Sequence, residues 1–266
     1  MAANELCLNL FQYSTMLGKG APLDSALAAA RDAGFQLVGL DVFTLDDAGL
    51  APGEARALLD RHGVRCFEIL GLAVGASEEE TMEAARRAAR WVGETGAEWV
   101  LTVVDAPVDA AVVDRFARAA GVVADAGGRL ALEFLPHLAV STIADARRVC
   151  DAAGADRAAV LVDSWHVFRG TNSLADVAAM PAEAIAYVQF DDALPLAGEL
   201  ADEVMARRVW PGDGEFPLAD FADAIRATGY AGPVSIEVLN AEWRDRGLDV
   251  RDFANDAART CTPYWT

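Results

Sequence analysis

Four short apolar runs in the second half of the chain each end at, or just before, a side chain whose oxygen atoms could bind a cation. The residues at these ends are Glu133, Asp163, Gln189 and Glu237. Buried strands of a parallel sheet are normally apolar throughout, so a carboxylate or an amide at the end of one needs a chemical reason. One such residue alone is typical of an ion pair or a helix cap. Four successive runs that end alike indicate a shared site.

These four residues would form a cluster of oxygen atoms with a strong negative charge. Three carboxylates and an amide repel one another when they converge, and a divalent cation removes that repulsion. Oxygen ligands favour Mg²⁺ or Mn²⁺, with Co²⁺ or Zn²⁺ as alternatives. Only three histidines and four widely spaced cysteines are present, which argues against a structural zinc site. We therefore predict one divalent metal ion, bound by Glu133, Asp163, Gln189 and Glu237.

Other side chains near these positions could act on a substrate. His166 comes three residues after Asp163 and is well placed to donate or accept a proton, although a purely structural histidine is the alternative. His137 and Trp165 could line the same pocket, unless the histidine faces solvent and the tryptophan only packs. Arg208, on a long segment after the seventh run, could bind an anionic or polyhydroxylated substrate; pairing with nearby acids at the surface is the alternative.

A regular alternation of apolar runs and amphipathic stretches must position these residues. Eight runs rich in β-forming residues are expected to be strands: Leu6–Gln12, Gln36–Val42, Val64–Leu70, Glu98–Val104, Arg129–Phe134, Ala158–Asp163, Ile185–Phe190 and Val234–Val238. Helices are expected between them, at Pro22–Ala33, Ala51–His62, Glu78–Thr95, Asp109–Ala126, Thr142–Ala153 and Pro217–Thr228. Glycines follow several of these helices just before the next strand, which is typical of right-handed crossovers in a parallel sheet.

Eight strand-and-helix units in 266 residues favour a single (β/α)₈ TIM barrel domain that spans residues 1–266. An open doubly wound sheet is the alternative, but no glycine-rich phosphate loop follows the first run. In a barrel the C-terminal ends of all strands meet on one rim, so the predicted ligands converge although they are far apart in the sequence. Long loops at 168–174 and 191–217 are expected to lie over the pocket.

The charge balance narrows the choice of partners. There are 41 Asp and Glu residues against 22 Lys and Arg, and the net charge of −19 repels phosphate backbones and anionic lipid. We expect neither nucleic acid nor a membrane as a partner. No signal-peptide pattern begins the sequence, and no apolar run approaches the roughly 20 residues that span a bilayer. A cytoplasmic protein with reduced cysteines is therefore expected; the sequence leaves open whether it forms a homo-oligomer.

At these residues the chain resembles the xylose isomerase-like TIM barrels, over nearly its whole length and most specifically from Glu133 onward. In that family a Glu, an Asp followed three residues later by His, a His or Gln, and a final Glu bind metal and substrate. The matching residues here are Glu133, Asp163 with His166, Gln189 and Glu237. The family includes sugar isomerases and epimerases, inosose dehydratase, 3-dehydroshikimate dehydratase and endonucleases of the endonuclease IV type. The endonuclease branch is not expected, because it needs additional histidine ligands and a basic face for DNA.

Residues 161–240 are most similar to the bacterial 3-dehydroshikimate dehydratases. Those proteins share the pattern Val-Gln-x-x-Asp-Ala ahead of Arg-x-x-Pro-Gly-x-Gly-Glu-Phe, which is present here. They also carry an arginine shortly after the third strand, which is expected to bind the substrate carboxylate. The corresponding stretch from Cys66 to Gly71 has none, and Glu68 would repel a carboxylate. An isomerase or epimerase is therefore favoured over the dehydratase.

The resemblance implies a small polyhydroxylated substrate and abstraction of a proton next to its carbonyl. Glu133 and Glu237 are expected to be metal ligands and proton carriers, His166 an acid or base, and Arg208 a substrate ligand. An enediolate that regains its proton at the other carbon or face gives isomerisation or epimerisation. Expulsion of a β-hydroxyl gives dehydration, of the 3-dehydroshikimate or inosose dehydratase type. A non-catalytic sugar-binding barrel is the alternative from another class, but its expected mark, a lost metal carboxylate, is absent.

Overall fold

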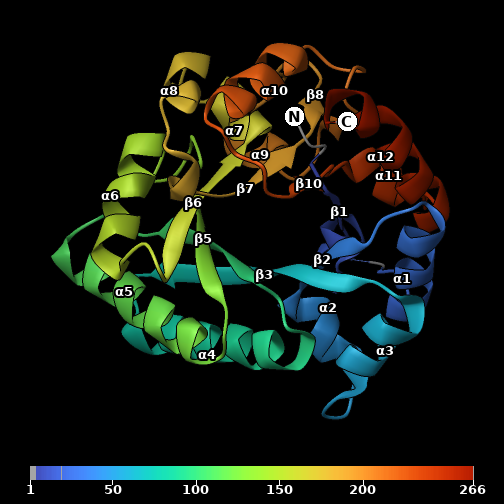
Figure 1. Ribbon diagram of the computed structural model, residues 1–266, viewed down its shortest axis with the longest axis horizontal. Coiled ribbons are helices and arrows are strands. Elements are labelled where there is room, and N and C mark those ends of the chain that lie inside the picture. Colours follow the sequence, from blue (N-terminus) through green and yellow to red (C-terminus); the bar gives the residue numbers. More distant parts are fainter. Residues whose placement is uncertain (1–3, 19, 266) are drawn as a thin grey trace.

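The computed structural model describes residues 4–18 and 20–265, and at its centre is a closed barrel of parallel strands. The strands follow one another around the barrel in chain order, and helices surround them (Figure 1). The barrel strands are β1 (Leu6–Asn9), β2 (Leu37–Asp41), β3 (Arg65–Gly75), β4 (Trp99–Asp105), β5 (Arg129–Glu133), β6 (Ala158–Asp163), β7 (Ile185–Phe190) and β10 (Val234–Ile236). The predicted (β/α)₈ barrel is confirmed.

All six predicted helical stretches are present, within one to three residues of their expected bounds. They are α1 (Leu23–Asp32), α3 (Glu54–His62), α4 (Glu78–Thr95), α5 (Ala110–Asp125), α6 (Ile143–Ala153) and α10 (Leu218–Ala227). Several other helices were not predicted: α2 (Val42–Asp47), α7 (Ser164–Arg169), α8 (Leu174–Ala178), α9 (Leu200–Glu203), α11 (Ala241–Asp245) and α12 (Val250–Trp265). Most of these have four to six residues, too few for a clear helical period. Within the described residues, no helix is both long and apolar enough to cross a membrane.

Two strand ends differ from the prediction by more than two residues. β1 stops at Asn9, because the Asn9 side chain accepts a hydrogen bond from the backbone N–H of Phe11 at 2.9 Å and so closes a turn. β3 instead runs five residues past Leu70, because it stays paired with β4 beyond an irregularity at Gly71. Gly71 has a φ of +119°, which a side-chain-bearing residue rarely adopts. The prolonged β3 therefore rises above the rim on one side of the barrel.

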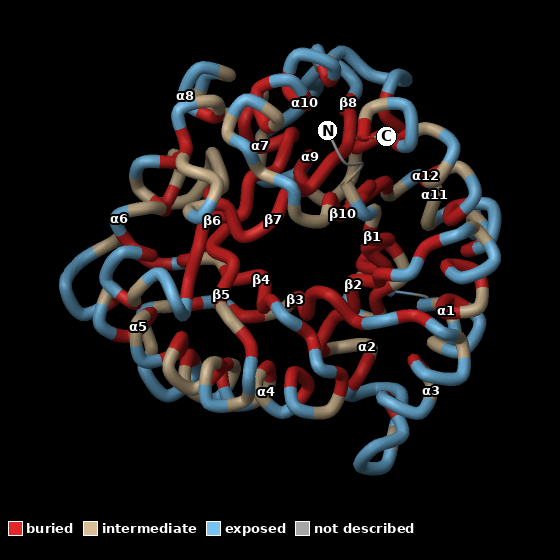
Figure 2. Tube along the Cα trace, in the orientation of Figure 1, coloured by how far each residue is buried: buried red, intermediate tan, exposed pale blue. Residues whose placement is uncertain are grey.

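The apolar core has two layers, which follow from the alternation of side chains along each strand. One layer fills the barrel and includes Cys7, Trp99 and Tyr187. The other lies between the barrel and its helices and includes Leu8 and Phe116. In Figure 2 the strands are buried along nearly their whole course, and exposed residues gather on the outer helices and loops. The barrel is thus a rigid support for the residues on its C-terminal rim.

The long segment after β7 is folded back over the rim rather than left open. It contains a small antiparallel sheet in which β8 (Asp192–Ala193) pairs with β9 (Arg208–Val209). The Asp192 carboxylate accepts hydrogen bonds from the backbone N–H groups of Gly212, Gly214 and Phe216, at 3.0 to 3.1 Å. These contacts explain the Asp-Ala and Pro-Gly-Asp-Gly-Glu-Phe patterns: the first supplies the carboxylate that holds the backbone of the second. They also fix β9, and with it Arg208.

Candidate active site

The four predicted metal ligands come together on the rim. Glu133 ends β5, Asp163 ends β6, Gln189 lies near the end of β7, and Glu237 directly follows β10. Asp163 is paired in register with Gln189, and Gln189 with Ser235, so neighbouring strands present these residues at similar heights. All four side chains are buried. The fold therefore produces the convergence expected from a barrel rim.

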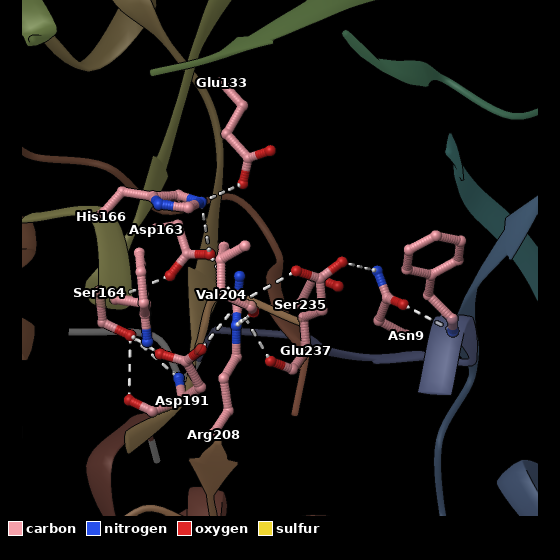
Figure 3. A network of polar contacts seen from close by, with 12 residues as sticks. Asn9, Glu133, Asp163, Ser164, His166, Asp191, Val204, Arg208, Ser235 and Glu237 are labelled. Atoms are coloured by element: carbon pink, nitrogen blue, oxygen red, sulfur yellow. Dashed lines mark hydrogen bonds and ion pairs between the residues drawn. The ribbon is translucent and has the colours of Figure 1, made fainter. Parts of the chain in front are cut away.

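His166 is brought back over the rim by α7, which starts directly after β6. The Asp163 carboxylate accepts a hydrogen bond from the backbone N–H of Trp165 at 2.7 Å and caps this helix. His166 Nε2 then lies 2.8 Å from Glu133 Oε1 and 3.5 Å from Asp163 Oδ2 (Figure 3). Ligand atoms of these three residues lie within 4.8 Å of one another, close enough to hold one metal ion.

Arg208 is buried in the middle of the carboxylates rather than paired at the surface. Its Nη1 lies 2.8 Å from Asp163 Oδ2, 2.7 Å from Asp191 Oδ2 and 3.1 Å from Glu237 Oε2 (Figure 3). Burial opposes the charged form, but these carboxylates raise the pKa of Arg208 above its ordinary value. Arg208 thus stays positively charged, and its ion pairs link the ends of β6, β7 and β10.

The acidic groups still outweigh the cations. Burial, followed by repulsion from Glu133 and Asp163, raises the pKa of Glu237 well above its ordinary value, although Arg208 opposes the shift. Burial and the neighbouring Asp163 likewise raise the pKa of Asp191, again against the effect of Arg208. Burial is the largest cause of both shifts, and repulsion between the neighbouring carboxylates adds to it, so a further cation in the cluster would stabilise the ionised forms.

Gln189 supplies a second sign that a ligand is needed. Its side chain is completely buried, and neither Oε1 nor Nε2 has a hydrogen-bond partner among the described residues. A buried polar group without a partner costs about 1–3 kcal/mol. A divalent cation accepts amide and carboxylate oxygens together. The acidic excess and the unpartnered amide both fit such an ion.

A chain of buried side chains leads from Glu237 into the barrel interior. Asn9 Nδ2 donates hydrogen bonds to Glu237 Oε1 at 3.2 Å and to Glu68 Oε1 at 3.0 Å. The Ser235 hydroxyl also donates to Glu68. Glu68 lies at a bulge of β3 opposite Gly39, where an added Cβ would lie only 2.5 Å from Glu68 Oε1. Gly39 therefore makes room for a carboxyl group inside the barrel.

Glu68 gives the protein a pH dependence that can be measured. Burial raises the pKa of Glu68 from 4.5 to about 7, although hydrogen bonds from Ser235 and Asn9 oppose the shift. The folded state therefore holds this proton up to about pH 7, whereas the unfolded chain releases it near pH 4.5. The stabilisation is complete below pH 4.5 and is lost as the pH rises through 7, a fall of about 3 kcal/mol in the free energy of unfolding.

Glu68→Gln should remove this pH-dependent loss of stability, since the amide keeps the shape of the side chain and does not titrate. Urea unfolding with chelator at pH 5 and pH 8 would show a smaller loss of stability for the variant than for the wild type. Glu242→Gln, at an exposed position, is the matched control and should keep the wild-type loss. Equal losses in all three proteins would contradict the assignment to Glu68.

Asn9 and Asp191 were not among the predicted site residues, and Glu68 lies elsewhere than predicted. Asn9 ends β1 and Asp191 directly follows β7, so both carry the signal that identified the four ligands: a polar residue where a buried strand ends. Glu68 was expected to face the substrate. The bulge in β3 instead turns its carboxyl group into the barrel interior, beneath Asn9.

The cavity at this rim has a volume of about 260 Å³, and Glu133, His166, Arg208 and Glu237 are part of its lining. Trp165 and His137 are not. Trp165 is buried; its ring makes a T-shaped contact with that of His166, and its centroid lies 5.8 Å from the Arg208 guanidinium carbon. His137 is partly buried, and burial, followed by the nearby His166, lowers its pKa. Their roles in substrate binding stay predictions.

Known families and curated proteins include several that are similar to this chain. Residues 27–257 match the family described as xylose isomerase-like TIM barrel. An inosose isomerase of Halalkalibacterium halodurans is 30% identical over 120 residues, which cover 44% of this chain and 42% of the relative. A 3-dehydroshikimate dehydratase of Pseudomonas putida is 34% identical over 101 residues, which cover 38% of this chain and 16% of the relative. The matched region thus spans less than half the length of either curated relative.

A solved structure repeats the architecture over nearly the whole chain. The crystal structure of the IOLI protein with a bound zinc atom superposes with a TM-score of 0.83 and 17% sequence identity, and covers 98% of this chain and 97% of that one. At this identity the likeness shows the fold alone.

Proposed function

Since the chain belongs to the xylose isomerase-like TIM barrel family, we propose that it is a divalent-metal-dependent isomerase or epimerase of a polyhydroxylated carbonyl compound. One observation carries the proposal: buried carboxylates and an unpartnered amide converge on one rim around His166 and Arg208. The named relatives, an inosose isomerase and a 3-dehydroshikimate dehydratase, support an enzyme with a small-molecule substrate.

Glu133, Asp163, Gln189 and Glu237 would hold the ion. A divalent cation supplies Lewis-acid stabilisation of the negative charge that develops on a substrate oxygen. The structural neighbour binds a zinc atom, but the donor set here is mostly oxygen, so we propose Mn²⁺ or Mg²⁺ as the preferred ions.

The protein's own groups would move the proton. Glu133 comes from β5 and Glu237 follows β10, with β6 and β7 between them in the barrel, so the two carboxylates approach a bound substrate from different sides. One of them removes the proton next to the carbonyl, and the enediolate regains it at the other carbon or the other face. His166, hydrogen-bonded to Glu133, would pass the proton between the carboxylate and a substrate oxygen. Arg208 would orient that oxygen.

His166→Gln should separate proton transfer from metal binding. The variant should lower kcat by about 100-fold or more, because a general acid or base contributes that much, while KM changes less. Bound metal, measured by elemental analysis after gel filtration, should stay at the wild-type level. If the metal is lost together with the activity, His166 is a ligand rather than a proton carrier, and this role falls.

The dehydratase of the 3-dehydroshikimate or inosose type is the second candidate. The position of Glu68 removes one of the two objections to it. The objection that Glu68 would repel a substrate carboxylate weakens, because Glu68 is not part of the cavity lining and its carboxyl is hidden beneath Asn9. The missing arginine still counts against it: the part of β3 that lines the cavity, Leu70 to Ala73, is apolar.

One experiment tests these alternatives together. Metal-depleted protein is supplied with Mn²⁺ and incubated in D₂O with 3-dehydroshikimate, an inosose or a ketohexose, and the reaction is followed by NMR and absorbance. Metal-dependent exchange of a proton next to the carbonyl, with an isomeric product, supports the isomerase or epimerase. A new aromatic absorbance with 3-dehydroshikimate overturns that order in favour of the dehydratase. Binding without exchange or product supports the non-catalytic barrel.

A cytoplasmic location and self-association stay predictions.

A further inference from the structure

The rim cavity is divided sharply into a polar half and an apolar half. Its polar side chains are the four reacting groups Glu133, His166, Arg208 and Glu237. The other described residues that line it are apolar or glycine. They come from β3 and β4, from the segments that follow β1, β2, β5 and β10, and from the turn after α9. Phe11, Phe43, Leu72, Val103, Leu135 and Met205 represent this half.

The apolar half is built by the fold and is not incidental surface. The continuation of β3 to Gly75, paired with β4 up to Asp105, raises a wall above the rim that carries Leu72 and Val103. At the mouth, Met16 belongs to the cavity lining and is 56% exposed. Met16 therefore extends the apolar lining to the mouth of the cavity.

A free sugar fits this cavity poorly. Such a molecule carries a hydroxyl on nearly every carbon, and a hydroxyl that loses water without gaining a hydrogen-bond partner is penalised. The described side chains on the apolar half offer no hydrogen-bonding group, apart from the weakly accepting methionine sulfur. A ring without hydroxyls gains from the same wall through the hydrophobic effect. The two halves therefore call for an amphiphilic substrate.

This inference rests on the metal-dependent proton transfer of the proposed function and narrows its substrate: we propose that only a hydroxy-ketone head is polar, and that the natural substrate joins this head to an aromatic or alicyclic group. The head is bound by the carboxylates, Arg208 and the metal ion. The apolar group lies against the wall formed by β3 and β4, with its outer edge beneath Met16. The substrate class is thus an aryl- or cycloalkyl-substituted hydroxy ketone rather than an unsubstituted ketose.

Two small hydroxy ketones test the apolar group directly. Hydroxyacetone and 2-hydroxyacetophenone share the head and differ in a methyl against a phenyl group. With Mn²⁺-loaded protein we expect the phenyl compound to bind at least about tenfold more tightly, and acetophenone, which lacks the hydroxyl, to bind weakly. Affinities are measured by calorimetry, and proton exchange of both hydroxy ketones in D₂O is followed by NMR. D-fructose should bind no better than hydroxyacetone.

Paired variants locate the effect. Met16→Gln combined with Val103→Thr alters the wall without a change of size at position 103, and should reduce the preference for the phenyl compound to about threefold or less. Leu196→Gln, at a position that is 47% exposed and outside the cavity lining, should leave it unchanged. Circular dichroism and gel filtration confirm that the variants fold.

Other outcomes overturn the inference, and they separate it from the proposed function. If both compounds exchange protons in a metal-dependent way but bind equally, the proposed function is supported and the apolar substrate group is ruled out. If neither compound binds and metal has no effect, the proposed function and the apolar substrate group are both ruled out. If the Met16 variant changes the oligomeric state and leaves the preference intact, the apolar half is an interface between subunits and not a substrate site.

Discussion

Glu237→Gln should lose at least about 100-fold in affinity for Mn²⁺ and at least about 100-fold in kcat, because the variant removes a metal ligand and a proton carrier at once. The amide keeps the shape of the side chain, so the fold and the contact with Asn9 are retained in outline. Added Mn²⁺ raises the melting temperature of a protein that binds it in the folded state. The wild type should show this rise, and the variant should show little of it.

Glu242→Gln is the matched control for this substitution. Glu242 lies five residues further along the chain, is exposed, and pairs with Arg246. Its substitution should leave metal affinity, kcat and the Mn²⁺-dependent rise in melting temperature at wild-type values. A Glu237→Gln protein that responds to Mn²⁺ as the wild type does would remove Glu237 from the metal site.

Arg208→Met should lower the free energy of unfolding of the metal-free protein by about 3–5 kcal/mol, because removing one partner of a buried ion pair leaves uncompensated charge. Three carboxylates, from Asp163, Asp191 and Glu237, lose their shared cation in this variant. A bound divalent ion restores positive charge to the same cluster. We therefore expect the deficit to shrink when the unfolding experiment is repeated with saturating Mn²⁺ in place of chelator.

Arg207→Met provides the comparison at the neighbouring position. Arg207 is partly exposed and pairs at 3.4 Å with the buried Glu203, which keeps a hydrogen bond from the backbone N–H of Ala197 when the arginine is replaced. Its loss should have a small effect that does not depend on metal. If Arg208→Met unfolds at the wild-type urea concentration in the presence of chelator, Arg208 does not neutralise the cluster.

The sequence was sufficient for the barrel and for the four polar strand ends. Gln189 and Asp163 could be placed on one rim because closure of a parallel sheet puts equivalent strand positions side by side, whatever their distance along the chain. His166 could be expected near the same rim because it lies only three residues after Asp163, although α7, which brings its side chain back to Glu133, was not predicted.

The remaining contacts depend on packing that no local pattern encodes. Asn9 reaches Glu237 across 228 positions, at the seam where the barrel closes. From the sequence, Arg208 was expected on a long loop after the seventh strand. The pairing of β8 with β9, which Asp192 holds in place, buries it among the carboxylates. A single bulge in β3 decides that Glu68 faces the barrel interior. Bulges and loop returns are set by the whole fold rather than by periodicity.

The central claim is that one divalent ion is bound by residues from four neighbouring strand ends, and anomalous diffraction at the manganese absorption edge from crystals grown with Mn²⁺ tests it most directly. We predict a single strong peak on the rim, at about 2.0–2.6 Å from oxygen atoms of Glu133, Asp163, Gln189 and Glu237. A peak elsewhere, a peak that leaves the Gln189 amide unligated, or no peak at all would contradict the account.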